Sequence, residues 1–149
     1  MISWLLATAL LAQHQYPKSA ALPPANGYSH VVVAAPGKMV FLAGQVALDR
    51  EGKLVGKDDL KAQTEKVFEN LKTALASAGA DFSHVVKVNW YVKNFQPSQV
   101  PVIREVRNRY FDLKNPPAST LVGVSELFMA DVLIEVEVTA VIPEKAGKS

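Results

Sequence analysis

The segment "DVLIEVEVTAVI", from Asp131 to Ile142, constrains the fold more than any other, because its residues alternate with the period of a β-strand. One side of this strand would be wholly apolar and the other mixed. A wholly apolar side must be buried against another element, so the strand is expected inside a sheet with one covered face. The apolar side consists of Val132, Ile134, Val136, Val138 and Ala140, and the mixed side of Leu133, Glu135, Glu137, Thr139 and Val141.

Short strands and two helices are expected in the rest of the chain. Runs of β-branched residues on either side of Pro36-Gly37 predict a hairpin. Apolar residues recur at helical spacing from Leu60 to Ala78, and Pro97 is expected to open a second helix. The segments "HVVKVNWYVKN" and "ASTLVGV" predict two further strands, and the first alternates so that Val86, Val88, Trp90 and Val92 share one face. This order of elements predicts an α+β fold, a mixed sheet with two helices packed on one face.

The mixed side of the last strand predicts self-association. Two helices can cover only one face of a sheet, and the sequence holds no further helix for the other face. That other face would carry Leu133 and Val141 beside the two glutamates of the same strand. A half-apolar face without a covering element favours contact with another copy of the chain.

Composition excludes several classes of function. The 149 residues are 49% hydrophobic and 20% charged, with a net charge of +2, which is typical of one globular domain. Arg104, Arg107, Arg109 and Lys114 are the densest basic group, and they are interpreted as a solvated helix face, so no nucleic-acid partner is expected. The chain has no cysteine, and its three histidines lack ligand spacing, so no metal site is expected.

The first residues indicate export. Residues 1–12 hold an apolar run that ends in small residues and is too short to span a bilayer, which is typical of a signal peptide. Residues 13–26 are expected to be a Pro-rich tether, 27–143 the folded domain and 144–149 a polar tail. We therefore expect a periplasmic or secreted protein with no stable membrane anchoring after processing. A cytoplasmic protein with an apolar N-terminal tail is the alternative.

Two carboxylates on the last strand are candidates for catalysis. Glu135 and Glu137 are two positions apart, so both project from one face of the strand, roughly 7 Å from each other. Crowding on a partly apolar face raises the pKa of one such carboxyl and suits the pair to general acid–base work. The alternative is that they face solvent or a subunit contact. Gly44, in "FLAGQV", is expected at a bulge or a close backbone approach.

Five segments together resemble the Rid/YjgF family of reactive-intermediate deaminases, formerly labelled L-PSP endoribonucleases. The resemblance covers residues 25–143 in the family's order and spacing. It implies a chorismate-mutase-like α+β subunit, a homotrimer, and three small-molecule clefts formed between neighbouring subunits, with no cofactor. The segments are "GYSHVV", "FLAGQV", "FENLKTALASAGADFSHVVKVNWYVKN", "RYFDLKNPPAS" and "DVLIEVEVTAVIP".

The resemblance also assigns site residues. Active members hydrolyse imines and enamines such as 2-aminoacrylate to keto acids and ammonia, and an arginine in their Pro-Ala-Arg-Ser/Thr motif binds the substrate carboxylate. Here that motif ends in Ser119 and Thr120, so a hydroxyl replaces the guanidinium. Glu135 matches the glutamate that holds the attacking water. Three further positions match substrate contacts of the family, namely Tyr28 at the cleft mouth, Gly44 and the Leu121 amide. Arg104 stands where the family usually has asparagine.

Three functions remain open at this point. The first is a Rid-type hydrolase whose specificity is weak or altered because of Ser119, with Arg104 as one candidate to replace the lost arginine. The second is a non-catalytic trimer that binds a small metabolite. The third and most remote is a ribonuclease, which neither a basic-aromatic surface nor a pair of catalytic histidines supports.

Overall fold

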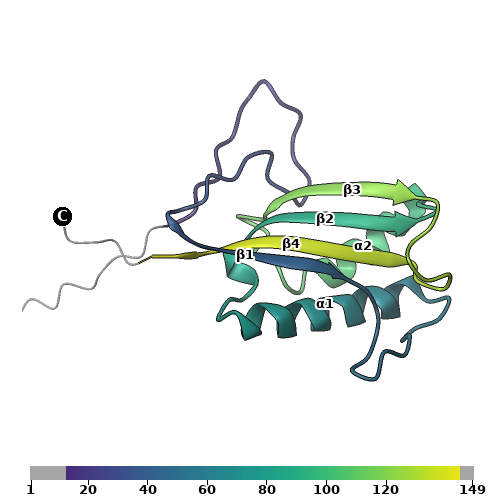
Figure 1. Cartoon of the computed structure of the whole chain (residues 1–149). Coiled ribbons are helices and arrows are strands. Elements are labelled where there is room, and N and C mark those ends of the chain that lie inside the picture. Colours follow the sequence, from purple (N-terminus) through teal and green to yellow (C-terminus); the bar gives the residue numbers. More distant parts are fainter. Residues whose placement is uncertain (1–12, 145–149) are drawn as a thin grey trace, which may run out of the picture.

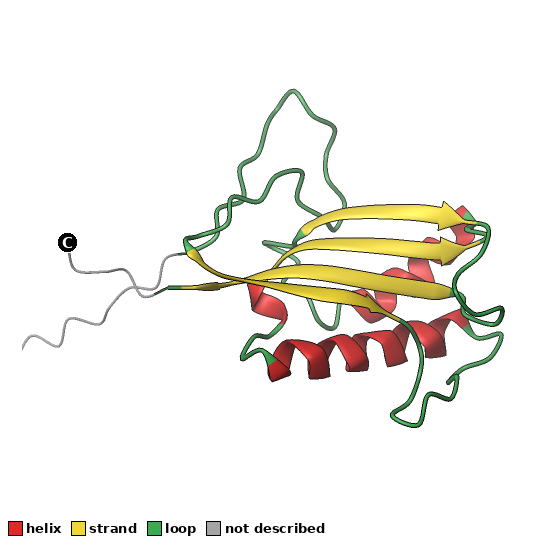
Figure 2. Ribbon diagram, in the orientation of Figure 1, coloured by secondary structure: helices red, strands yellow, loops and turns green. Residues whose placement is uncertain are grey.

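The computed structural model describes residues 13–144 and shows a four-stranded mixed sheet with both α-helices on one face (Figure 1, Figure 2). The expected α+β architecture is therefore confirmed. Two single-turn 3-10 helices, Phe82–His84 and Pro97–Gln99, precede β2 and α2. The main elements are β1 (Gly37–Gln45), α1 (Leu60–Ser77), β2 (Val85–Lys93), α2 (Val100–Arg107), β3 (Ala118–Val124) and β4 (Ile134–Pro143).

The strand order is β1-β4-β2-β3, so the last strand of the chain lies inside the sheet. β4 pairs antiparallel with both β1 and β2, whereas β2 and β3 are parallel and α2 lies in the crossover between them. The alternation expected for β4 is confirmed, because its apolar side faces the helices and is buried. Val132, Ile134, Val136, Val138 and Ala140 are each at most 2% exposed.

The core lies between the sheet and α1. Asp59 caps this helix by accepting a hydrogen bond from the backbone N–H of Ala62 at 2.9 Å. Phe68, fully buried, projects from α1 into the middle of the core, where its ring lies 5.6 Å from that of Trp90 on β2. Burial of a side chain of this size stabilises the fold by about 1.5–3 kcal/mol. The buried core therefore lies on the one face of the sheet that the helices cover.

The hairpin predicted at Pro36-Gly37 is wrong. β1 begins at Gly37, and the β-branched run before it forms no strand beside β1. Val33 instead makes a two-residue antiparallel bridge with Gln15, with backbone hydrogen bonds of 2.8 and 2.9 Å. β-Branched residues favour an extended backbone, but a strand needs a partner, and the partner of β1 is β4.

A smaller correction concerns β2. Perfect alternation would bury Val86, yet Val85 is the buried residue, at 2% exposure. The pairing register between β2 and β4 shifts between Val85 and Lys87, which marks a bulge. From Val88 onward the predicted alternation holds.

The segment expected to be a tether, 13–26, folds back beside the sheet as the purple loop of Figure 1. His14 accepts a hydrogen bond at Nδ1 from the backbone of Ala35, at 3.0 Å. The expected signal peptide, 1–12, and residues 145–149 of the expected tail lie outside the described residues. Within 13–144, no helix is long and apolar enough to cross a membrane.

Candidate functional site

Strand pairing places Ser119 and Thr120 on opposite faces of the sheet. Ser119 pairs with Val88, whose side chain is buried under the helices, and Thr120 pairs with Asn89 on the open face. The Thr120 hydroxyl accepts a hydrogen bond from Lys87 Nζ at 2.6 Å. Of these two residues, Ser119 is therefore the one whose side chain faces the space between β3 and α2.

A pocket of about 260 Å³ lies between β3 and α2, and we call it the α2 pocket. It brings together four of the residues expected at the site, namely Tyr28, Arg104, Ser119 and Leu121. Its remaining lining comes from the core side of β2, from α2 and from the loop before β1. These further residues are Asn26, Trp90, Phe95, Val100, Ile103 and Arg107.

Ser119 is bonded to the aromatic wall of the α2 pocket. Its Oγ accepts a hydrogen bond from Trp90 Nε1 at 2.9 Å, and Trp90 is only 2% exposed. A buried indole N–H requires an acceptor, and the hydroxyl supplies one. An arginine at this position could not accept that bond, since a guanidinium has no acceptor atom. A serine at position 119 therefore satisfies the buried Trp90 indole in a way that an arginine could not.

Two arginines of α2 line the same pocket. Arg104 donates from Nη2 to the backbone carbonyl of Asn26 at 3.3 Å, and Arg107 donates to Asn108 Oδ1 from Nε and Nη2 at 3.1 and 2.8 Å. The Arg107 guanidinium lies against Gly27, whose φ of +78° and missing Cβ leave room for it. Burial lowers the pKa of Arg107, and the neighbouring Arg104 charge lowers it further. The solvated helix face expected here is wrong for both residues, which are half-buried, while Arg109 is exposed and paired with Glu65.

Gly44 and Glu135 form a second, separate part of the expected site. The register between β1 and β4 shifts between Leu42 and Gln45, so Gly44 lies at an irregularity, as expected. A Cβ on Gly44 would overlap the Glu135 carboxylate, so glycine is what lets that side chain lie over β1. Glu135 pairs with Tyr91 on the open face of the sheet. It is therefore on the opposite face from the α2 pocket.

The two glutamates of β4 have different surroundings. Glu137 Oε1 accepts hydrogen bonds from Asn89 Nδ2 at 2.8 Å and from the Tyr91 hydroxyl at 3.0 Å. This bond to Glu137 raises the pKa of Tyr91. The Glu135 carboxylate accepts no hydrogen bond from any residue within 13–144. Glu137 is thus held by neighbouring side chains, and Glu135 is the carboxylate available to a ligand or water.

Sequence reasoning missed six residues of the α2 pocket, and the most informative of them are Trp90, Phe95 and Arg107. Trp90 lies in the core as well as in the wall of the pocket. Arg107 could have been found from its spacing, because it follows Arg104 by three positions and so shares its helix face. No sequence signal places Phe95, which follows β2, beside the pocket.

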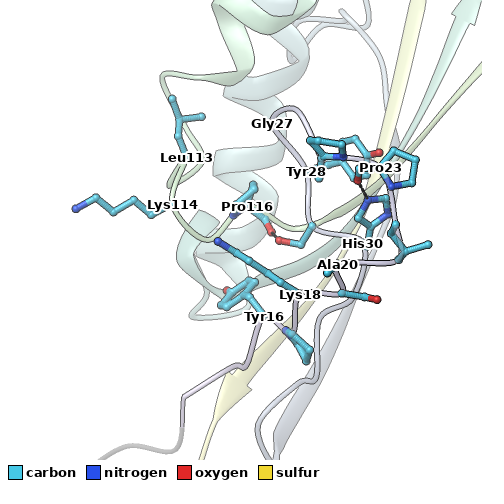
Figure 3. A pocket seen from close by; sticks show the side chains of 16 residues that line it. Tyr16, Lys18, Ala20, Pro23, Gly27, Tyr28, His30, Leu113, Lys114 and Pro116 are labelled. Carbon is cyan, nitrogen blue, oxygen red and sulfur yellow. Dashed lines mark hydrogen bonds between the residues drawn. The ribbon is translucent and has the colours of Figure 1, made fainter.

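A larger cavity than the α2 pocket lies in the N-terminal loop (Figure 3). It has a volume of about 530 Å³ and lies between residues 16–30 and the turn at 113–116. Figure 3 shows Lys18 and Tyr16 near Pro116, and His30 Nε2 lies 2.9 Å from the Pro23 carbonyl oxygen. Tyr28 is the expected site residue that this cavity shares with the α2 pocket. In the described part of the chain, no three His, Asp or Glu residues gather as metal ligands would.

Comparison with known proteins gives a consistent result. Residues 18–142 match the family model described as Endoribonuclease L-PSP. The chain is 39% identical over 117 residues to a RutC family protein of Pyrococcus abyssi, an alignment that covers 78% of this chain and 87% of that protein. It is 32% identical over 119 residues to the 2-iminobutanoate/2-iminopropanoate deaminase of Dermatophagoides farinae, covering 80% and 88% of the two chains.

A solved structure agrees with these sequence matches. The crystal structure of YyfB, a protein of unknown function of the conserved Rid protein family from Yersinia pestis, superposes with a TM-score of 0.81. The two chains are 34% identical, and the match covers 87% of this chain and 99% of the other.

Proposed function

Because this chain belongs to the Rid/YjgF family, whose model is described as Endoribonuclease L-PSP, we propose that it hydrolyses small imines and enamines with a specificity altered by Ser119. The observation that carries the proposal is the Glu135 side chain, which lies over Gly44 and is free of internal hydrogen bonds within the described residues. The name of the Dermatophagoides farinae relative supports the class of substrate.

In the proposed reaction, Glu135 acts as general base. Its carboxylate takes a proton from a water molecule, and the water oxygen forms a bond to the imine carbon. As this bond forms, the C=N π electrons become a lone pair on nitrogen, which takes the proton held by Glu135 and gives a carbinolamine. Glu135 then transfers the hydroxyl proton of the carbinolamine to the same nitrogen, and the C–N bond breaks as the C=O bond forms. An imine and one water thus give a carbonyl compound and ammonia, and no cofactor enters the balance.

The site is proposed to be completed by a neighbouring copy. The α2 pocket and the Gly44–Glu135 pair lie on opposite faces of one sheet, so a single copy does not bring them together. The open face also exposes apolar side chains, with Met39 at 56%, Phe41 at 72% and Val122 at 42% exposure. A homotrimer that buries this face and joins the α2 pocket of one copy to Glu135 of the next accounts for both observations.

The proposal is tested by hydrolysis of 2-iminopropanoate, generated in the assay and followed by release of ammonia. Glu135→Gln should reduce the rate by about a hundredfold or more, because an amide cannot take the proton from water. Glu137→Gln is the matched control, since it changes the same group two positions away, and it should retain most of the activity. Equal rates for wild type and Glu135→Gln would refute the role of Glu135.

A non-catalytic protein that binds a small metabolite is the second candidate, and Ser119 is the observation that favours it. A hydroxyl cannot make the bidentate contact that a guanidinium makes with a carboxylate. A wild-type protein that binds ligand in the cleft but releases no ammonia would establish this candidate in place of the first.

A further inference from the structure

The α2 pocket has a marked charge imbalance. Two of its lining residues are arginines, and none is an aspartate or glutamate. Arg104 and Arg107 are three positions apart on α2, so both guanidinium groups lie on the helix face toward the pocket. The positive charge of this pair therefore favours binding of an anion in the pocket.

Neither of these two arginines has a carboxylate partner among the described residues. The other two arginines of the chain, Arg50 and Arg109, each form an ion pair with a carboxylate. Each guanidinium carries five N–H donors, and their hydrogen bonds within 13–144 go only to the Asn26 carbonyl and the Asn108 side chain. Half-buried like charges without a counter-ion destabilise each other, and a bound anion would relieve this.

The rest of the pocket suits an apolar group. Trp90, Phe95 and Ile103 supply its apolar walls, while the Ser119 hydroxyl, whose oxygen already accepts from Trp90, keeps its own proton to donate. A volume of about 260 Å³ is below the usual range for drug-sized ligands, so the ligand must be small.

We propose that the α2 pocket binds a small carboxylate with a short apolar chain, and that Arg104 and Arg107 together hold the carboxylate in place of an arginine at position 119. The inference rests on the proposed function and deepens it, because it assigns the residues that hold the carboxylate of the substrate. Arg107 is the new assignment, as a specificity-determining residue that neither the motif nor the resemblance identifies.

Binding of butanoate to the full-length protein tests this without any reaction. Calorimetry gives the affinity, and the indole N–H signal of Trp90 in ¹H–¹⁵N spectra reports the pocket, with Trp4→Phe used to assign the two indoles. Butanoate should bind and shift the Trp90 signal, whereas butanamide, its uncharged analogue, should do neither. Butanamide that binds as tightly as butanoate would overturn the role of the arginines.

Variants show which arginine contributes to carboxylate binding. Arg107→Gln and Arg104→Gln should each weaken butanoate binding about tenfold or more, since each removes a charge-assisted contact. Arg107→Lys should bind with intermediate affinity, because it keeps the charge and loses the planar fork. Arg109→Gln is the control, because Arg109 is close to Arg107 in sequence but does not line the pocket, and this variant should bind butanoate like wild type. Unchanged affinity in both glutamine variants, with native spectra, would refute the inference.

The two proposals fail in different ways. Butanoate binding that depends on Arg107, in a protein that hydrolyses no imine, would keep this inference and overturn the proposed function. Imine hydrolysis with the same KM in wild type and Arg107→Gln would keep the proposed function and overturn this inference.

Discussion

The indole N–H of Trp90 donates to the hydroxyl oxygen of Ser119 at 2.9 Å, across the parallel pair β2 and β3. This bond connects Ser119, a predicted site residue, to a side chain that is 2% exposed. The Ser119 side chain therefore contributes to the packing of the core and also lines the α2 pocket.

Ser119→Ala should destabilise the fold by about 1 kcal/mol. The substitution leaves the Trp90 N–H without its acceptor, and the α2 pocket beside it admits water that offsets part of the loss. Denaturant unfolding measures the change in the free energy of unfolding. Ser125→Ala is the control, because Ser125 is exposed and just beyond the end of β3, and it should stay within about 0.5 kcal/mol of wild type.

Ser119→Arg should not improve imine hydrolysis in the wild-type background. The new guanidinium would lie beside Arg104 and Arg107 and would displace the acceptor of Trp90. In the Arg107→Gln background the same change should recover activity, since it returns one bidentate donor to the pocket. Steady-state rates of the three variants decide this. A Ser119→Arg single variant faster than wild type would show instead that the pocket lacks only the family's arginine.

Gly44→Ala should lower activity while leaving stability almost unchanged. A Cβ at this position overlaps the Glu135 carboxylate, which is the mobile end of a flexible side chain and can swing away at little cost. Displaced Glu135 no longer holds its water, so kcat should fall at least about tenfold. Ala43→Ser, one position earlier on β1, is the control and should keep both kcat and the unfolding free energy. A Gly44→Ala enzyme with normal kcat would remove Glu135 from the mechanism.

Phe41→Glu should convert the proposed trimer to monomers. Phe41 is 72% exposed and pairs with Thr139 on the open face, where a charge could not be buried between copies. Light scattering at micromolar concentration should give three chain masses for wild type and one for the variant. Phe128→Glu is the control, because Phe128 is similarly exposed, at 68%, but lies in the loop before β4. This variant should remain a trimer. A wild-type monomer would contradict the proposed assembly.

The sequence predicted the parts of the fold that depend on periodicity. The alternation of β4 and the helical spacing of α1 each follow from one buried side, and a single buried side is visible in the residues themselves. The hairpin at Pro36-Gly37 failed because strand propensity does not identify a partner. Val33 pairs with Gln15, eighteen positions earlier, and no local pattern shows that contact.

The sequence names individual candidate residues for the site but not their arrangement. The resemblance points to Ser119 and Glu135, yet only the strand register shows that they lie on opposite faces of the sheet. Spacing places Arg107 on the helix face of Arg104, but no sequence pattern shows its contact with the N-terminal loop. Its contact with Gly27 joins the N-terminal loop to α2 across 80 positions of sequence, and a charged residue near a helix end is usually solvated.

The position of β4 has a consequence for how the chain folds during synthesis. Among the described strands, β1 pairs with β4 alone, and β4 is the last of these four strands to leave the ribosome. Until then β1 presents unpaired backbone and the side chains of Met39 and Phe41, a combination that chaperones recognise and that promotes aggregation. The sheet can close only after translation has passed Pro143. Yield in cells should therefore depend on translation speed and chaperone supply more than on the stability of the finished domain.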